Sequence, residues 1–241
     1  MLSPLLSIVI PTREEERAIG AAIKRLLVLK IPHEVIVSDG RSADQTVEIA
    51  RTLADAVVVY DGTATHTAGR GRNDGARVAK GEFIAFLDAD ASVIDPNDFF
   101  ARALAHFDDP RVMGVTGPQR ARPDVETWAD RCSYGISNFN MHAMNALGVG
   151  TACGKFMLVR RSVFEEMRGF REELVAYEDG DLFYRLSKRG RTVFDTRLVV
   201  YHGARRPHKI GWTRMWWTWS ANFLSYTFFN KSISPDWTPV R

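Results

Sequence analysis

Short, wholly apolar segments alternate with amphipathic segments over residues 6–87, and this alternation limits the possible folds more than any other feature. Residues 6–10 form an apolar run that ends at Pro11, which is typical of a strand buried on both faces of a parallel sheet. Apolar residues then recur at helical spacing over 18–27, with charged residues between them, and Pro32 follows. This alternation predicts a mostly parallel sheet whose strands are joined by right-handed helical crossovers.

The pattern continues along the rest of the chain. Ser42 and Gln45 have the spacing of a capping box, which predicts the start of a helix that runs through residue 53. Further strands are expected at 34–38, 56–60, 82–87, 112–116, 156–159 and 197–201, the last of which would close the sheet. Further helices are expected around 73–79, from Asp95 onward, over 125–147 and over 178–188. We therefore predict an α/β protein with one Rossmann-like domain and a mostly parallel central sheet, followed by a C-terminal aromatic amphipathic helix.

Size and composition exclude several other classes. A chain of 241 residues with 45% hydrophobic and 25% charged residues fits one ordinary globular domain. The formal net charge of +3 is too small to indicate nucleic-acid binding. Cys132 and Cys153 lack metal-site spacing and are expected to be free thiols in a reducing compartment. Residues 1–10 have no basic leader or cleavage site, so we expect a first strand there and a cytoplasmic protein.

Acidic side chains follow the predicted strands. In open α/β sheets, ligands bind outside the carboxyl ends of the strands, where Glu15, Asp39, Asp88 and Asp90 are expected to lie. Asp88 and Asp90 are two residues apart in an extended segment, so both carboxylates can face one site. Such a pair suits Mg²⁺ or Mn²⁺ that holds a diphosphate. A lone Asp-x-Asp more often caps a turn, but this one ends the most apolar strand, where an unpaired charge is costly.

Five segments in this order make the chain resemble the family-2 glycosyltransferases, which share the nucleotide-diphospho-sugar transferase (GT-A) fold. They are residues 7–12, 37–44, 71–76, 86–90 and 178–182. The resemblance covers roughly the first 200 residues. It implies an inverting enzyme that moves a sugar from a nucleotide-diphospho-sugar to an acceptor hydroxyl with a divalent metal, Mn²⁺ or Mg²⁺.

The resemblance also implies a division of the chain. Residues 1–209 would be the catalytic domain, with a nucleotide-sugar-binding half over 1–118 and an acceptor-binding half over 119–209. Residues 210–241 would form a helical tail.

The resemblance assigns donor-binding roles residue by residue. Pro11, Thr12 and Glu15 would line the nucleoside pocket, and Asp39 would accept a hydrogen bond from the nucleobase imide. Glu14 stands where the family usually has Asn, which leaves the contacts of that turn open. Contacts to an imide favour a UDP-sugar as donor, although a GDP-sugar also fits.

Metal and catalytic roles follow in the same way. Asp90 would bind the metal, and Asp88 would contact the ribose or a metal-bound water. In some relatives a histidine placed like His202 completes the metal site, and an imidazole would shift preference toward Mn²⁺. Asp179 would be the general base that takes the proton of the acceptor hydroxyl. Its acidic neighbours at the start of the helix also stabilise that helix, so Asp181 is interpreted as a capping residue.

Basic residues near the site are candidates for neutralising the departing diphosphate. Guanidinium groups and helix N-termini both bind phosphate, and surface charge is the alternative interpretation of each residue. The candidates are Arg70 and Arg72 before the third helix, and Arg205, Arg206 and Lys209 after His202.

The C-terminal segment is aromatic and basic. Residues 202–241 hold six basic residues and one acidic residue, a net charge of +5. The stripe of Trp212, Trp216, Trp219, Phe223 and Tyr226 lies on one face of the predicted helix. We expect peripheral membrane contact through 210–230, which would let the enzyme reach a lipid-linked acceptor. Packing against the catalytic domain or a dimer partner is the alternative, and the run is too short and polar to span a bilayer.

Three other functions were weighed against the glycosyltransferase. A dinucleotide-dependent oxidoreductase is disfavoured because the glycines of residues 69–75 have the wrong spacing and follow the wrong strand. A sugar-1-phosphate nucleotidyltransferase lacks its basic glycine-rich loop after the first strand. A non-catalytic sugar or nucleotide binder of the same fold remains the alternative, and Asp179→Asn would discriminate it.

Overall fold

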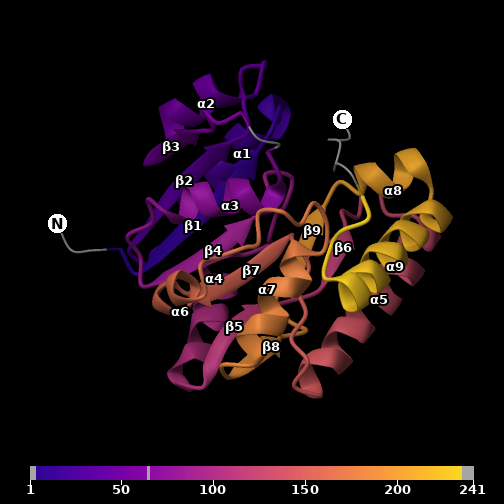
Figure 1. Cartoon of the computed structure of the whole chain (residues 1–241). Coiled ribbons are helices and arrows are strands. Elements are labelled where there is room, and N and C mark those ends of the chain that lie inside the picture. Colours follow the sequence, from indigo (N-terminus) through magenta and orange to yellow (C-terminus); the bar gives the residue numbers. More distant parts are fainter. Residues whose placement is uncertain (1–3, 64–65, 235–241) are drawn as a thin grey trace.

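The computed structural model describes residues 4–63 and 66–234, which form an α/β fold around a seven-stranded sheet (Figure 1). The strand order is β3-β2-β1-β4-β7-β5-β8, and a separate pair, β6-β9, lies beside it. The strands are β1 (Leu6–Thr12), β2 (His33–Asp39), β3 (Ala56–Val59), β4 (Phe83–Leu87), β5 (Val112–Thr116), β6 (Gln119–Ala121), β7 (Phe156–Arg160), β8 (Arg191–Phe194) and β9 (Val200–His202).

Helices cover both faces of the sheet. They are α1 (Glu16–Leu26), α2 (Thr46–Leu53), α3 (Ala68–Ala76), α4 (Pro96–Ala105), α5 (Trp128–Ala146), α6 (Arg161–Glu166), α7 (Glu178–Ser187), α8 (Arg205–Ile210) and α9 (Trp212–Phe229), with a 3₁₀ turn at His106–Asp108. Buried side chains of α1, α2 and α4 form one core with the sheet, and those of α3, α6 and α7 form a second core on the other face. This three-layer arrangement confirms the predicted α/β fold.

The sheet is mostly parallel, as predicted. β3, β2, β1 and β4 pair in parallel, and so do β5 and β8. β7 runs antiparallel to both of its neighbours, β4 and β5. Because β7 is reversed, its first residues lie at the edge where β1 and β4 end, which brings residues 153–155 to the site.

Three local predictions were wrong. The segment 197–201 does not close the main sheet, because Arg197 N–H donates to the Asp195 carboxylate (2.9 Å) in a turn, and the following strand, β9, pairs with β6. β8 forms that edge of the sheet instead. Ser42 is not a helix cap, since its hydroxyl donates to Asp39 (2.6 Å) and α2 begins only at Thr46.

Helix α3 also begins earlier than predicted. The Thr67 hydroxyl caps it by accepting a hydrogen bond from the N–H of Arg70 (3.1 Å). The helix therefore starts at Ala68, and Arg72 lies within it with 3% of its side chain exposed. Arg72 was predicted to precede the helix, but because α3 starts earlier it is a buried helical residue.

The C-terminal aromatic helix is present as α9, which lies alongside α5 (Figure 1). Trp212 donates to Asp130 of α5 (2.8 Å), and Trp216 donates to Ser133 (3.2 Å). Farther along, Tyr226 donates to Asp181 of α7 (2.8 Å). The predicted aromatic stripe thus packs on the rest of the chain, and Asp181 anchors α9 rather than only capping α7.

The outer side of α9 is apolar as well. Trp217 is 75% exposed and Phe228 is 73% exposed. Within residues 4–63 and 66–234, no helix is long and apolar enough to cross a membrane. The last part of the predicted 210–241 tail, residues 235–241, lies outside the described residues.

Candidate active site

One cavity of about 790 Å³ opens at the carboxyl ends of β1 and β4. It gathers eight of the nine residues predicted for the site, namely Pro11, Thr12, Glu15, Arg72, Asp88, Asp90, Asp179 and His202. The ninth, Asp39, lies behind Thr12, whose hydroxyl donates to its carboxylate (3.0 Å). Asp39 is fully buried and also accepts hydrogen bonds from the N–H and hydroxyl of Ser42. It therefore fixes the turn after β2, and its contact with a nucleobase stays a prediction.

The carboxylates of Asp88 and Asp90 face each other across one position, and the ammonium group of Lys155 occupies that position. Lys155 Nζ lies 3.0 Å from Asp88 Oδ2 and 2.9 Å from Asp90 Oδ1. Burial alone would raise the pKa of Asp90, but the positive charges of Lys155 and Arg205 outweigh it and hold that pKa below its usual range. Both carboxylates thus face the cavity paired with Lys155.

Lys155 was not predicted from the sequence as a residue of this site. The direction of β7 brings it there, because an antiparallel neighbour of β4 has its first residue beside the last residue of β4. Leu87 indeed pairs with Phe156, so Lys155 stands next to Asp88. The sequence alone gave no reason to reverse that strand.

His202 ends β9 beside the carboxylate pair. It is 4% exposed, its Nδ1 accepts a hydrogen bond from the N–H of Ala204 (3.2 Å), and its ring stands edge-on against Tyr134. Burial, with help from Lys155, lowers the pKa of His202 to about 3, so the ring is neutral at physiological pH. Its Nε2 is buried without a hydrogen-bond partner among the described residues.

Arg72 joins the two acidic clusters of the site. Its guanidinium donates to Glu178 (2.7 Å), to Asp88 (3.2 Å) and to the carbonyl of Gly154 (3.1 Å). Burial would lower the pKa of Arg72, but the carboxylates of Glu178 and Asp88 raise it, so the guanidinium stays charged. The arginine thereby fixes the start of α7 relative to the end of β4.

Asp179 lies in the first turn of α7 and lines the cavity. Burial, and secondly the Glu178 carboxylate, raise the pKa of Asp179 to about 7, although Arg72 opposes the rise. Its Oδ1 accepts a hydrogen bond from the N–H of Gly180 (2.7 Å). A carboxylate with this pKa can accept a proton near neutral pH, which is the property of a general base.

The other basic candidates divide into two groups. Arg205, the first residue of α8, donates to Glu15 (2.8 Å) and contacts Asp90 (3.3 Å), and Arg206 lines the cavity. Arg70 pairs with Glu172 (3.0 Å), and Lys209 is not part of the cavity wall. Arg205 is therefore the candidate that the fold brings to the carboxylates.

The far part of the cavity runs between α5 and α9 and has a different character. Its walls carry apolar and aromatic side chains: Ile136, Met141, Met144, Met215, Trp216, Trp219 and Phe223. Tyr177, with φ of 69°, precedes α7 and borders the same space. The cavity thus joins a charged end to an apolar end.

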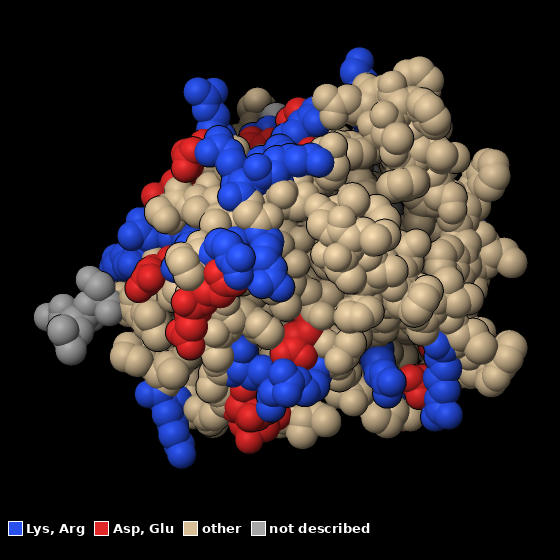
Figure 2. All heavy atoms as spheres, turned by 90° about the horizontal axis from the view of Figure 1, so that it is seen from below, with Lys and Arg blue, Asp and Glu red and all other residues tan. Residues whose placement is uncertain are grey.

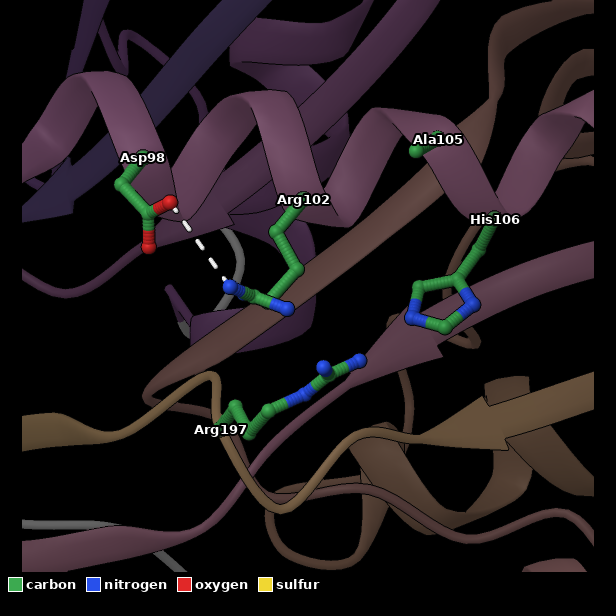
Figure 3. A pocket seen from close by; sticks show the side chains of 5 residues that line it. All are labelled: Asp98, Arg102, Ala105, His106 and Arg197. Carbon is green, nitrogen blue, oxygen red and sulfur yellow. Dashed lines mark ion pairs between the residues drawn. The ribbon is translucent and has the colours of Figure 1, made fainter.

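A second hollow, of about 310 Å³, lies elsewhere and is lined by Asp98, Arg102, Ala105, His106 and Arg197 (Figure 3). Its polar groups pair with one another or with Asp195: Arg102 lies 3.7 Å from Asp98, and His106 lies 2.9 Å from Asp195. None of the predicted site residues is there, so we place the active site in the larger cavity.

Comparison with known proteins points to one family of transferases. The family model "Glycosyl transferase family 2" matches residues 7–168. The O-antigen chain rhamnosyltransferase WbaN of Salmonella anatum is 27% identical over 166 residues, which is 66% of this chain and 52% of that protein. The succinoglycan biosynthesis protein ExoA of Rhizobium meliloti is 29% identical over 208 residues, 81% of this chain and 62% of that protein. The chain thus spans little more than half the length of these curated relatives.

Solved structures show the same fold. A mannosyltransferase from Pyrobaculum calidifontis, in complex with GDP-Man and Mn²⁺, superposes with a TM-score of 0.72 at 21% identity, covering 98% of this chain and 67% of that one. Glucosyl-3-phosphoglycerate synthase from Mycobacterium tuberculosis, in complex with Mn²⁺ and UDP, gives a TM-score of 0.59 at 19% identity, covering 92% and 79%. The architecture is that of the GT-A glycosyltransferases.

Proposed function

Because the chain belongs to glycosyl transferase family 2, we propose that it is an inverting enzyme that moves a sugar from a nucleotide-diphospho-sugar to an acceptor hydroxyl with a divalent metal. The observation that carries the proposal is the single cavity in which paired carboxylates, Asp88 and Asp90, lie at the same end as Asp179, whose pKa is raised to about 7. The pair suits a metal-bound diphosphate, and Asp179 suits proton transfer.

The donor occupies the charged end of the cavity. Pro11, Thr12 and Glu15 line its entrance from β1, and Asp39 supports Thr12 from behind. Arg72 holds Asp88 in place for the ribose side of the donor. A UDP-sugar is favoured and a GDP-sugar remains the second candidate, since similar folds have been solved with UDP and with GDP-Man.

The metal site consists of Asp90 and His202, with Asp88 beside it. The residues fit Mn²⁺ or Mg²⁺ because His202 is neutral and its buried Nε2 lacks a partner among the described residues. Among residues 4–63 and 66–234, no group of three or more His, Cys, Asp or Glu side chains could hold a metal. Oxygens of the donor diphosphate would therefore complete the coordination. When bound, the metal would neutralise charge on the leaving nucleotide.

Asp179 accepts the proton of the acceptor hydroxyl as that oxygen attacks the anomeric carbon opposite the leaving diphosphate, which inverts the configuration. Arg205, beside Asp90, lies where it adds positive charge to the leaving-group side. Burial raises the pKa of the Cys153 thiol to about 11, so this cavity-lining sulfur stays protonated. The transfer needs no covalent intermediate on the protein.

The acceptor enters along the apolar end of the cavity, between α5 and α9. An apolar wall suits an acceptor with a hydrocarbon part, and a lipid-linked acceptor is consistent with relatives that build O-antigen chains. Residues 1–118 would then form the donor-binding half and 119–209 the acceptor-binding half of the catalytic domain, with the tail of 210–241 completing the acceptor side.

We further propose that this side of the protein contacts the cytoplasmic face of a membrane peripherally through 210–230. Charged residues gather on the left of Figure 2, whereas the right side, over α5 and α9, is mostly uncharged. Exposed apolar side chains there come from both helices: Trp128, Ile136 and Phe139 of α5, and Trp217, Leu224, Phe228 and Phe229 of α9. Such a face suits the boundary between lipid headgroups and acyl chains.

Liposome co-sedimentation tests the membrane contact. The double variant Trp217→Ser and Phe228→Ser is expected to lose most of its binding to vesicles with anionic lipid. Ile94→Ser is the matched control, because Ile94 is 85% exposed but lies before α4. Equal sedimentation of the double variant and the wild type would remove the membrane proposal.

A thermal-shift screen tests the proposed donor site. A nucleotide at about a hundred times its dissociation constant adds roughly 2.7 kcal/mol of stability, so UDP or GDP should stabilise the protein with Mn²⁺ present. Asp90→Ala should abolish the metal-dependent part. The non-catalytic binder would be supported instead if the wild type transferred no sugar and the nucleotide bound equally well to the wild type and to Asp179→Asn.

A further inference from the structure

Lys155 is the basic residue closest to the carboxylate pair, and the proposed reaction does not yet give it a role. Its ammonium group bridges Asp88 and Asp90 at 3.0 and 2.9 Å. The two carboxylates hold this ammonium group between them. It holds the position in which two acidic side chains converge.

The backbone fixes Lys155 at this place. β7 begins at Phe156, which pairs with Leu87, the last residue of β4. Glycine at the preceding position leaves room for Arg72, since a Cβ on Gly154 would lie 2.7 Å from Arg72 Nη2, the atom that donates to the Gly154 carbonyl. Only 23% of the Lys155 side chain is exposed. Lys155 is therefore a built part of the site rather than a mobile surface lysine.

A divalent cation and this ammonium compete for the same oxygens. A metal ion on Asp90 would lie about 2.0–2.6 Å from a carboxylate oxygen, whereas Lys155 Nζ already lies 2.9 Å from Asp90 Oδ1. Two positive charges at such short range repel each other strongly in a partly buried site. A metal on Asp90 would weaken the hold of that carboxylate on Lys155, and the anionic diphosphate of the donor offers the ammonium a new partner.

We propose that Lys155 couples metal binding to nucleotide binding. In the free protein it occupies the carboxylate pair and keeps divalent metal out, and when metal and nucleotide enter together it moves to the diphosphate. The inference rests on the proposed function of the same cavity. Lys155 is thus a residue that orders ligand binding and contacts the donor, because its ammonium has two alternative anionic partners.

The experiment measures ligand binding rather than turnover. Mn²⁺ alone is titrated into the full chain and followed by electron paramagnetic resonance of the free ion, and UDP and GDP are titrated by calorimetry in the presence of saturating Mn²⁺. Lys155→Met should bind Mn²⁺ alone at least about tenfold more tightly than the wild type, because the competing charge is gone. The same variant should bind UDP and GDP in the presence of Mn²⁺ at least about tenfold more weakly, because the charge-assisted contact of Lys155 with the diphosphate is lost.

Three further variants serve as controls. Lys155→Arg retains the charge and should keep the weak Mn²⁺ binding of the wild type. Lys24→Met removes an exposed positive charge on α1 and should change neither affinity. Lys155→Gln replaces Lys155→Met if the latter does not fold, with the same expected direction.

The outcomes separate this inference from the proposed function. If UDP and GDP bind with Mn²⁺ but Lys155→Met and Lys155→Gln bind Mn²⁺ alone no more tightly than the wild type, the role of Lys155 is overturned and the proposed function stands. If no nucleotide binds in any condition, the proposed donor site fails. The titration with Mn²⁺ alone still decides whether Lys155 excludes the metal.

Discussion

Replacing Asp179 by Asn should slow transfer by about a hundredfold or more and at the same time stabilise the protein. The folded protein raises the pKa of Asp179 from 3.8 to about 7. This carboxyl therefore contributes stability that is present below pH 3.8 and is lost as the pH rises through about 7. At pH 8 the folded protein carries an unfavourable buried charge that asparagine does not have.

The size of the effect follows from the same shift. At about 1.4 kcal/mol per pKa unit, the rise corresponds to about 4 kcal/mol for an isolated, fully buried carboxylate. Asp179 lines an open cavity, where water and relaxation reduce the penalty, so we expect about 1–2 kcal/mol of stabilisation at pH 8. For a chain of this size that raises the melting temperature by roughly 2–8 °C, and the gain should shrink by more than half at pH 5.

Asp181→Asn is the matched control, two residues along the same helix. Asp181 is 1% exposed and accepts hydrogen bonds from Arg185 (2.8 Å) and Tyr226 (2.8 Å), so loss of its charge should destabilise by about 1–3 kcal/mol. Scanning calorimetry of both variants at pH 5 and pH 8 checks the contrast. A fall in melting temperature for Asp179→Asn at pH 8 would refute the argument that the buried charge of Asp179 lowers the stability of the folded protein.

The remaining predictions concern the same cavity. kcat/KM should rise with pH through about 7, because Asp179 must be ionised to accept a proton; a rate that is flat from pH 5.5 to 8.5 would argue against this base. His202→Ala should weaken the binding of Mn²⁺ in the presence of nucleotide by about tenfold or more while leaving metal-free nucleotide binding unchanged, as measured by calorimetry. Tyr226→Phe should lower the melting temperature by roughly 2–4 °C, the effect of about 1 kcal/mol, because it removes the bond to Asp181 that ties α9 to α7.

Sequence patterns predicted most of the sheet and the two carboxylates at its edge because both depend on local signals. An apolar strand that ends in acidic residues places those residues at the carboxyl edge of a parallel sheet, wherever the other strands lie. Asp88 and Asp90 were found in this way, and the resemblance added Asp179 and His202.

What the sequence missed depends on contacts between distant segments. The direction of β7 brings Lys155 to Asp88, and no local pattern of apolar residues distinguishes a parallel from an antiparallel central strand. Ser42 had the spacing of a helix cap, but its hydroxyl bonds to Asp39 at the end of β2 instead. The burial of Arg72 followed from the earlier start of α3, which the Thr67 cap determines.

The spacing of aromatic residues in the C-terminal helix did not predict which face of the helix packs against the protein. The spacing of Trp212, Trp216 and Trp219 fitted both core packing and membrane contact, and it is the packed face of α9 that carries this stripe. The exposed face is made of the residues between them, among them Trp217. A helix that is apolar all round gives no sequence signal for which side meets its neighbour.

The anomeric configuration of the released sugar tests the central claim most directly. A nucleotide sugar selected by the thermal-shift screen is incubated with the protein and Mn²⁺ with water as the acceptor, and proton NMR records the anomer of the hydrolysed sugar before it equilibrates. The account predicts a configuration opposite to that of the donor, at a rate that Asp179→Asn lowers by about a hundredfold or more. Retention of configuration, or an unchanged rate in Asp179→Asn, would contradict inverting transfer with Asp179 as the base.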